Sequence, residues 1–217
     1  IADLHLTGDS QCFPFYIYGE DGTNRRENVT DWALDRFRSH YGDESITKRD
    51  IFHYVYGVLH HEGYRERYAG NLKRQLPRTP FAPSLEAFRS FAEAGERLSE
   101  LHIGYEDAAP YPLNEVEDDS ADYEWRVEKM RFRQDKTAIK YNDFLTLEGI
   151  PERAHDYRLG NRSALEWIVN QYRVRTYKRY AITHDPNDSD NEWYIVDLIK
   201  RMTTVSVETV DIVEGLP

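Results

Sequence analysis

The stretch that decides the fold of the first half of the chain is Thr47–Leu59, TKRDIFHYVYGVL. Thr47 can cap the start of a helix, because Asp50 follows at the third position and can bond back to it. A stripe of aliphatic residues then recurs at the spacing of an α-helix: Ile51, Val55, Val58 and Leu59. A stripe of this kind faces a core. We therefore expect a buried helix here, inside a helical domain.

Similar helix signals lie on both sides of this stretch. Thr30 can cap a helix that ends near Gly42, and Ser84 can cap another that runs to about Leu101. Between them lies a short helical piece, followed by an extended connection that is forced by Pro77, Pro80 and Pro83. Residues 1–29 indicate irregular or short-strand structure. The first hundred residues are thus expected to be mainly helical.

The pattern changes after residues 105–124, which contain acidic residues and prolines but no Lys or Arg and predict a solvated loop. Beyond this loop, short segments favour β-structure at 125–132, 137–141 and 144–147, with Asn142–Asp143 as a hairpin turn. Residues 163–172 predict a helix and 174–183 a strand. A last helix starts at about Asn191, although its run 203–207, TTVSV, is a poor helix former that packing must stabilise.

These patterns predict an α+β fold, with a helical N-terminal half followed by a mixed α/β half that has short antiparallel strands and a long C-terminal helix. The expected division is a mainly helical subdomain at 1–104, an acidic loop at 105–124 and a mixed subdomain at 125–217. Because the chain begins at Ile1 rather than at methionine, we expect it to be a piece of a longer polypeptide.

Composition narrows the class of protein. No run in the 217 residues approaches the roughly 18 apolar residues of a membrane span, and the N-terminus lacks the pattern of a signal peptide. The single cysteine, Cys12, excludes an internal disulfide framework and a cysteine-based zinc site. We expect a soluble monomer of the cytoplasm, without a membrane partner.

Common enzyme signatures are missing from the sequence. There is no phosphate-binding loop, no dinucleotide fingerprint and no G-x-S-x-G elbow. Adjacent histidines on a helix point about 100° apart, so His60-His61-Glu62 is a poor zinc pair and favours a helix C-terminus. Asp118, Asp119 and Asp122 lack the Gly and the distant Glu of a calcium loop. Asp185-Pro-Asn-Asp188 indicates a turn. We expect no catalytic residue and no metal site.

Basic residues are dense in two stretches, although the net charge is -11. The first, Arg65–Arg78, could contact phosphates, or it could be a solvated helix face paired with acids elsewhere. In the second, Trp125–Asn142, basic residues alternate with Trp125, Met130, Phe132 and Tyr141. A β-ribbon would place those charges on one face, where Arg131 and Arg133, or Lys136 and Asn142, could reach base edges. An ordinary half-buried sheet is the alternative.

An ordered set of short motifs resembles the C-terminal target recognition domain of type ISP restriction-modification enzymes, over essentially the full chain. The motifs are DLHLTGDSQCFP (3–14), NVTDWAL (28–34), DIFHYVYGVLH (50–60), YRERY (64–68), LPR (76–78), FAEAG (91–95), KMRF (129–132), YND (141–143), GIP (149–151), SALEW (163–167), DPND (185–188) and TVSVET (204–209). The departures from the family lie in the acidic segment 105–124 and the short turn at 187–192.

The resemblance implies a function. In that family one polypeptide carries a nuclease, an ATP-driven helicase-like translocase, an adenine-N6 methyltransferase and a domain that reads a short asymmetric DNA site. This chain is expected to be that last domain, with double-stranded DNA and the other domains of its polypeptide as partners and no enzymatic activity of its own. It would hold no cofactor, whereas the parent enzyme would use S-adenosylmethionine, ATP and Mg.

The residues expected to contact DNA are chosen by their charge and expected geometry, and not by the resemblance. Phosphate contacts are expected from Arg25, Arg26, Lys73, Arg74 and Arg78. Base readout is expected from the 125–142 hairpin, through Lys129, Arg131, Arg133, Lys136, Lys140 and Asn142. One alternative is a structural module that docks on the methyltransferase with little DNA affinity. Another is a hydrolase that uses His60-His61-Glu62 and the Asp118 region.

Overall fold

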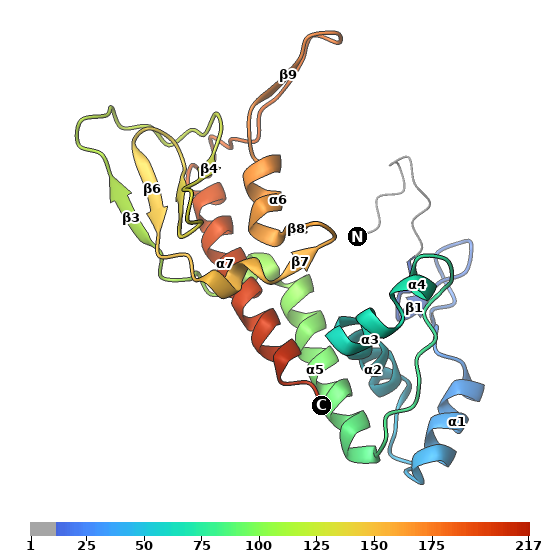
Figure 1. Cartoon of the computed structure of the whole chain (residues 1–217). Coiled ribbons are helices and arrows are strands. Elements are labelled where there is room, and N and C mark those ends of the chain that lie inside the picture. The colour runs from blue at the N-terminus through green and yellow to red at the C-terminus, as the bar shows by residue number, and fades with distance from the viewer. Residues whose placement is uncertain (1–11) are drawn as a thin grey trace. The chain divides into compact units, whose positions relative to one another are not determined.

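The computed structural model describes residues 12–217, which form two compact units (Figure 1). Among the described residues, unit 1 runs to Ser99 and includes Leu216–Pro217, and unit 2 is Glu100–Gly215. The predicted α+β class is confirmed, with helices first and short antiparallel strands and a long C-terminal helix after them. None of the helices in the described range is long and apolar enough to cross a membrane.

Unit 1 is built from helices and one small hairpin. Its elements are β1 (Tyr16–Ile17), β2 (Arg26–Glu27), α1 (Asp31–Tyr41), α2 (Lys48–His60), α3 (Glu62–Arg67), α4 (Ala69–Leu72) and the first part of α5 (Leu85–Ile103). The predicted capping box of α2 is confirmed: Asp50 N donates to Thr47 Oγ1 at 3.1 Å, and Thr47 N donates to Asp50 Oδ2 at 2.8 Å. Thr30 and Ser84 also cap as predicted, through hydrogen bonds from Ala33 N and Ala87 N.

The buried face of α2 differs from the predicted aliphatic stripe. Ile51 and Val58 are buried as expected, but Val55 and Leu59 are only partly buried, and the rest of the buried face is His53, Tyr54 and Gly57. The reason is the close approach of α5, since a Cβ atom on Gly57 would overlap the carbonyl oxygen of Phe91. A small residue at the crossing turns α2 toward α5 and moves the flanking aliphatic side chains outward.

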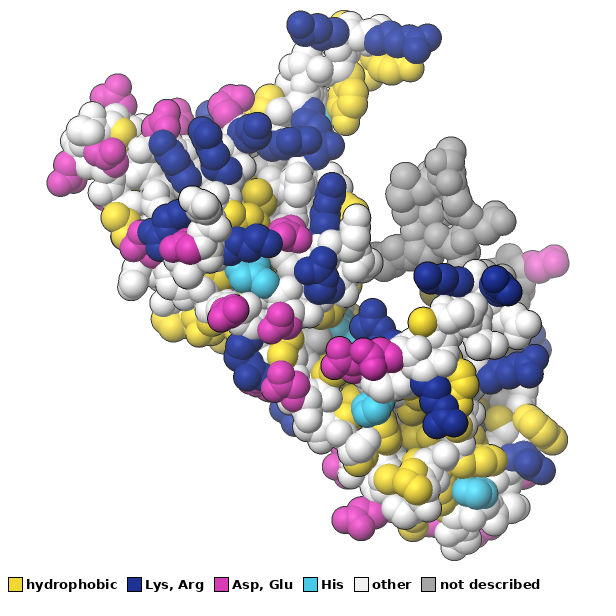
Figure 2. Space-filling model, in the orientation of Figure 1, with side chains coloured by type: hydrophobic (Ala, Val, Ile, Leu, Met, Phe, Trp, Pro, Cys, Tyr) yellow, Lys and Arg dark blue, Asp and Glu magenta, His cyan; other side chains and the backbone are white. Residues whose placement is uncertain are grey.

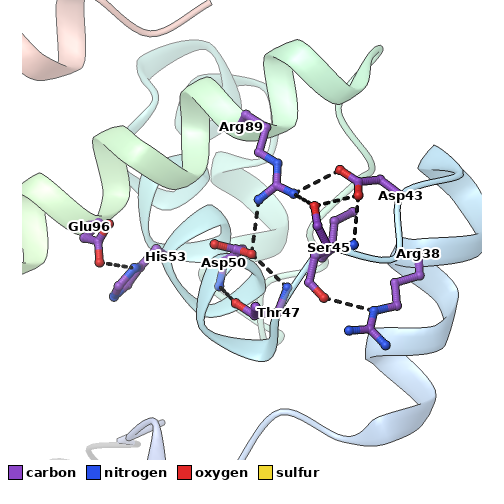
Figure 3. Close-up of polar contacts among 9 residues, drawn as sticks. Arg38, Asp43, Ser45, Thr47, Asp50, His53, Arg89 and Glu96 are labelled. Carbon is purple, nitrogen blue, oxygen red and sulfur yellow. Dashed lines mark hydrogen bonds and ion pairs between the residues drawn. The ribbon is translucent and has the colours of Figure 1, made fainter.

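A charged network ties α5 to the start of α2 (Figure 3). Arg89 on α5 donates to Asp43 Oδ2 at 3.0 Å, to Ser45 Oγ at 2.8 Å and to Asp50 Oδ2 at 3.2 Å. Hydrogen bonds from Ser45 and Arg89 lower the pKa of Asp43 to about 2. Asp50, whose carboxylate closes the capping box of α2, also accepts from Arg89 and so anchors α5.

Unit 2 combines a four-stranded antiparallel sheet with the end of α5 and two further helices. Its elements are η1 (Tyr105–Asp107), β3 (Asn114–Glu117), β4 (Arg131–Phe132), β5 (Ala138–Lys140), β6 (Leu145–Glu148), η2 (Glu152–His155), β7 (Arg158–Leu159), β8 (Arg162–Ser163), α6 (Ala164–Gln171), β9 (Arg175–Tyr177), β10 (Ile182–His184) and α7 (Tyr194–Glu214). The sheet order is β3-β6-β5-β4. Its core joins Ile139 and Leu147 of the sheet to Leu165 of α6 and Ile199 of α7.

Three local predictions for unit 2 need correction. The acidic segment 105–124 is not all loop, because it contains η1 and β3, which pairs with β6. Residues 125–130 form no strand and only 131–132 pair with β5. Residues 174–183 are not one strand but the arms of a hairpin, β9–β10.

The TTVSV run of α7 is helical, as expected from packing. Two buried hydroxyls in it are satisfied within the helix, because Thr203 Oγ1 donates to Ile199 O at 2.8 Å and Ser206 Oγ donates to Met202 O at 2.7 Å. These bonds let polar β-branched and small side chains face the core at little cost.

Candidate nucleic-acid interface

The residues predicted to contact phosphates lie in unit 1, in two places. Arg25 and Arg26 belong to the β1–β2 hairpin, and Lys73, Arg74 and Arg78 follow α4. All five are exposed. Within residues 12–217 no carboxylate lies within ion-pair distance of any of them. This argues against the alternative in which the basic stretch is paired with acids of the same chain.

Two tyrosines fix the segment that carries Arg78. The Tyr64 hydroxyl donates to the Arg78 carbonyl at 3.0 Å, and the Tyr54 hydroxyl donates to the Pro80 carbonyl at 2.7 Å. The extended connection is thus held against the helices of unit 1, and it borders a hollow of about 400 Å³ between Tyr64, Tyr68 and Pro80. The cations of this segment are therefore presented from a defined backbone.

His60, His61 and Asp118 have structural roles. The His60 ring contacts the Tyr56 carbonyl within its own helix, and His61 Nδ1 accepts from Tyr64 N as the cap of α3. Asp118 Oδ1 accepts from the backbone and side chain of Ser120. Among the described residues no group of three or more His, Cys, Asp or Glu could hold a metal ion.

The 125–142 region shows the predicted alternation of faces on β4 and β5. Arg131 lies directly opposite Lys140, and Phe132 lies opposite Ile139. Ile139 is fully buried and Phe132 packs on the core, whereas Arg131 and Lys140 are exposed. Because opposed residues share a face of the sheet, the two cations point to solvent together.

Most of the predicted base-reading side chains already make hydrogen bonds or ion pairs with other residues of the domain. Arg133 bonds to Asp135, Glu148 and Thr137, while Lys136 pairs with Glu166 at 2.8 Å and Lys140 with Asp143 at 2.6 Å. The hydrogen bonds that Arg133 donates to Asp135 and Glu148 raise its pKa, with the bond to Asp135 the larger cause. A nucleic acid would have to displace these carboxylates before such side chains could reach a base.

Asn142 has a different role from the predicted one. Its Oδ1 accepts from Phe144 N and Leu145 N, and its Nδ2 donates to the carbonyls of Glu124 and Arg126. Both donor hydrogens are used, so no donor remains for a base. Asn142 instead ties the β5–β6 turn to the segment before β4.

Lys129 and Arg131 are the predicted base readers that stay available. Both are exposed, and within residues 12–217 neither has a carboxylate within ion-pair distance. They flank the buried Met130 at the entry to β4. The predicted cluster thus reduces to two cations with unoccupied donors.

The β9–β10 ribbon is the surface that sequence reasoning did not single out. It projects from the rest of unit 2 (Figure 1) and carries Lys178 and Arg179 at its tip. No acidic residue occurs between Tyr172 and His184. The signal in the sequence was the basic run 158–179, in which six Lys and Arg residues stand against Glu166 alone.

Both arms of the ribbon are anchored to one short segment, 126–128. Before β9, Val174 N donates to the Glu128 carbonyl at 3.0 Å. After β10, Asn187 pairs with the backbone of Val127, and Arg126 Nη2 donates to Asp185 Oδ2 at 2.6 Å. The hydrogen bond from Arg126, followed by those from Asn187 N and Nδ2, lowers the pKa of Asp185 to about 2. We call this set of contacts the ribbon root.

The ribbon root joins the ribbon to the two available cations at and just before β4. Lys129 follows Glu128 directly, so the segment that holds the ribbon leads straight into Lys129 and Arg131. In Figure 2, Lys and Arg side chains gather at the ribbon tip and over the part of unit 2 beneath it, whereas Asp and Glu gather on the loop after β3. The ribbon tip is therefore basic, whereas the loop after β3 is acidic.

The family model for the type ISP C-terminal specificity domain matches residues 1–198. The chain belongs to this family. The specificity domain is 43% identical to part of DrdV in a cryo-electron microscopy structure of a DrdV–DNA complex, with a TM-score of 0.81 over 95% of this chain. It is 37% identical to part of a nuclease-deletion mutant of the type ISP enzyme LlaGI in complex with a DNA substrate mimic, with a TM-score of 0.75 over 94% of this chain.

A third solved structure extends this comparison. The ATP-dependent type ISP enzyme LlaBIII bound to DNA is 29% identical, with a TM-score of 0.79 over 93% of this chain. The specificity domain spans 21%, 18% and 13% of the DrdV, LlaGI and LlaBIII chains. No curated protein matches the sequence.

Proposed function

We propose that this specificity domain recognises a sequence in duplex DNA. The observation that carries the proposal is the ribbon root, which places the basic ribbon and the available cations Lys129 and Arg131 on one short segment of unit 2. The DNA-bound type ISP relatives support the choice of ligand. Lys73, Arg74 and Arg78 of unit 1 would add phosphate contacts, with Arg25 and Arg26.

The domain would act inside a larger restriction-modification enzyme. By orienting the duplex it would let a methyltransferase domain flip out its target adenine, and it would gate ATP-driven translocation and cleavage by other domains. S-adenosylmethionine, ATP and Mg would be bound by those domains. Its own contribution would be recognition without catalysis.

The test is selection of bound duplexes from a random-sequence library, followed by binding measurements on the enriched site over a range of salt. We expect a motif to be enriched, and we expect log affinity to fall with log salt by about 0.9 for each phosphate contact. A domain that enriches no motif and binds with a flat salt response would instead be a docking module for the methyltransferase.

A further inference from the structure

We propose that the β9–β10 ribbon enters the major groove of the recognised DNA, with the Tyr177–Ile182 face toward the base edges and the tip cations toward phosphates. This inference rests on the proposed function and assigns a specific element to it. It names contacts that lie outside the residues predicted from the sequence.

The large apolar side chains of the ribbon are exposed to solvent. Tyr177, Ile182 and Tyr180 are 49%, 59% and 65% exposed, on a two-stranded ribbon that extends into solvent (Figure 1). A two-stranded ribbon has little stability in water on its own, and large exposed apolar side chains on one mark a binding site. The ribbon is therefore built to be covered by a partner.

The charge of the ribbon selects a nucleic acid as that partner. Between Tyr172 and His184 the cations are Arg173, Arg175, Lys178 and Arg179, and no carboxylate lies among them. Lys178 and Arg179 occupy the exposed tip, where within residues 12–217 neither has an ion-pair partner. A concentration of unpaired positive charge in a chain of net charge -11 complements a phosphate backbone.

The two faces of the ribbon have different chemistry. Tyr177 lies opposite Ile182 on one face, and Thr176 lies opposite Thr183 on the other. The threonine hydroxyls are 3.1 Å apart and bond to each other, whereas Tyr177 and Ile182 expose large apolar side chains on their face. Apolar side chains contact thymine methyl groups in the major groove, and a phenol can donate to a base acceptor there.

The size and support of the ribbon also suit a groove. The major groove is about 12 Å wide and admits a two-stranded ribbon. Anchors at both ends of the ribbon, Val174–Glu128 and Asn187–Val127, fix its direction relative to the sheet. The same segment then presents Lys129 and Arg131 at the base of the ribbon, so groove and backbone contacts would form together.

Double variants of the 217-residue chain separate the two faces. On the enriched site against a scrambled duplex, Tyr177→Ala with Ile182→Ala should lower the affinity ratio by about 10-fold or more, as expected for lost base contacts. The matched pair Thr176→Val with Thr183→Val should change that ratio by less than about 3-fold, because it keeps side-chain volume and alters the other face. The opposite pattern would overturn the assignment of faces.

Charge variants test the tip. Lys178→Ala with Arg179→Ala should weaken binding to both duplexes and reduce the salt slope by about 2, the value for two phosphate contacts. Arg153→Ala is the control, since it removes one cation that pairs with Asp211 and Glu214 on η2 and α7. A salt slope that the tip variant leaves unchanged would contradict the proposal.

A photocrosslinking amino acid in place of Tyr180 gives a readout that does not depend on a weakened variant. It should crosslink to the enriched duplex, whereas the same group in place of the exposed Tyr123, in the acidic segment, should not. If the wild-type chain enriches no motif, the proposed function fails. If it enriches a motif but the ribbon variants bind normally and Tyr180 does not crosslink, only the ribbon assignment fails.

Discussion

Asn187 pairs with the backbone of Val127 as if it were a strand neighbour. Its Oδ1 accepts from Val127 N at 2.8 Å, and its Nδ2 donates to Val127 O at 3.0 Å. Val127 is fully buried, and residues 125–127 belong to no strand, so these bonds satisfy backbone groups that no ladder reaches. One side chain thereby joins the end of the ribbon to the core of unit 2.

Asn187→Ala should lower the free energy of unfolding by about 1–3 kcal/mol, because it leaves a buried N–H and a buried carbonyl without partners. Chemical denaturation measures the loss, and hydrogen exchange at the Val127 amide should speed up. Asn161→Ala is the matched control, since the Asn161 side chain is exposed and makes no hydrogen bond within the described part of the chain. Equal stability of the two variants would remove Asn187 from the ribbon root.

Asp185 should stay ionised in acid. Its pKa is lowered from 3.8 to about 2, chiefly by the hydrogen bond from Arg126. The stability that this pair contributes is therefore complete above pH 3.8 and is lost as pH falls through about 2. A carboxyl-carbon NMR titration should find the low midpoint, and Arg126→Gln should raise it toward 3.8. An unchanged midpoint in the variant would mean that Asn187 alone holds the carboxylate.

Arg131 and Arg133 should differ although they are two residues apart. Arg131→Ala should relax the sequence preference and cost about 1–3 kcal/mol of discrimination if the side chain reads a base. Uniform weakening on all duplexes would make Arg131 a phosphate contact. Arg133→Ala should leave DNA binding nearly unchanged and destabilise the β4–β5 turn, because its bonds go to Asp135, Glu148 and Thr137.

Gly95 should tolerate no side chain. A Cβ atom there would overlap the carbonyl oxygen of His53, so Gly95→Ala must push α5 away from α2. We expect unit 1 to lose at least about 3 kcal/mol of stability by thermal or chemical unfolding. Gly70→Ala is the control, because nothing lies within 4 Å of its Cβ position on α4, and it should stabilise by roughly 0.5–1 kcal/mol. A neutral Gly95→Ala would contradict the close crossing.

The helices were predictable because their signals are local. Thr30, Thr47 and Ser84 cap where the sequence places a hydroxyl before an apolar periodicity, and the α+β order follows from the change of pattern near residue 105. The buried face of α2 was harder to predict from the sequence. Whether Tyr54 and Gly57 or Val55 and Leu59 are buried depends on how closely α5 approaches.

The strands and the site were harder to predict, because they depend on pairing between residues that are far apart in the sequence. β3 reads Asn-Glu-Val-Glu, fully exposed, and is a strand only because β6 pairs with it from a distant part of the chain. The ribbon looked like one strand because its turn, Lys178–Ala181, has no Gly, Asn or Pro, and Ala181 takes a φ of 50° instead. The partners of Lys136 and Asn142 are likewise distant in sequence, since Lys136 pairs with Glu166 and Asn142 bonds to Glu124 and Arg126.

Because both arms of the ribbon are anchored to the same segment, we expect residues 175–184 to be replaceable as one unit by the corresponding hairpin of another specificity domain. Because both arms are held at the same three-residue segment, 126–128, and residues 175–184 add no side chain to the core of unit 2, we expect the length and tip of the ribbon to vary without repacking that core. Transplanting this hairpin between specificity domains is therefore the smallest graft that would carry a different groove contact onto an unaltered scaffold.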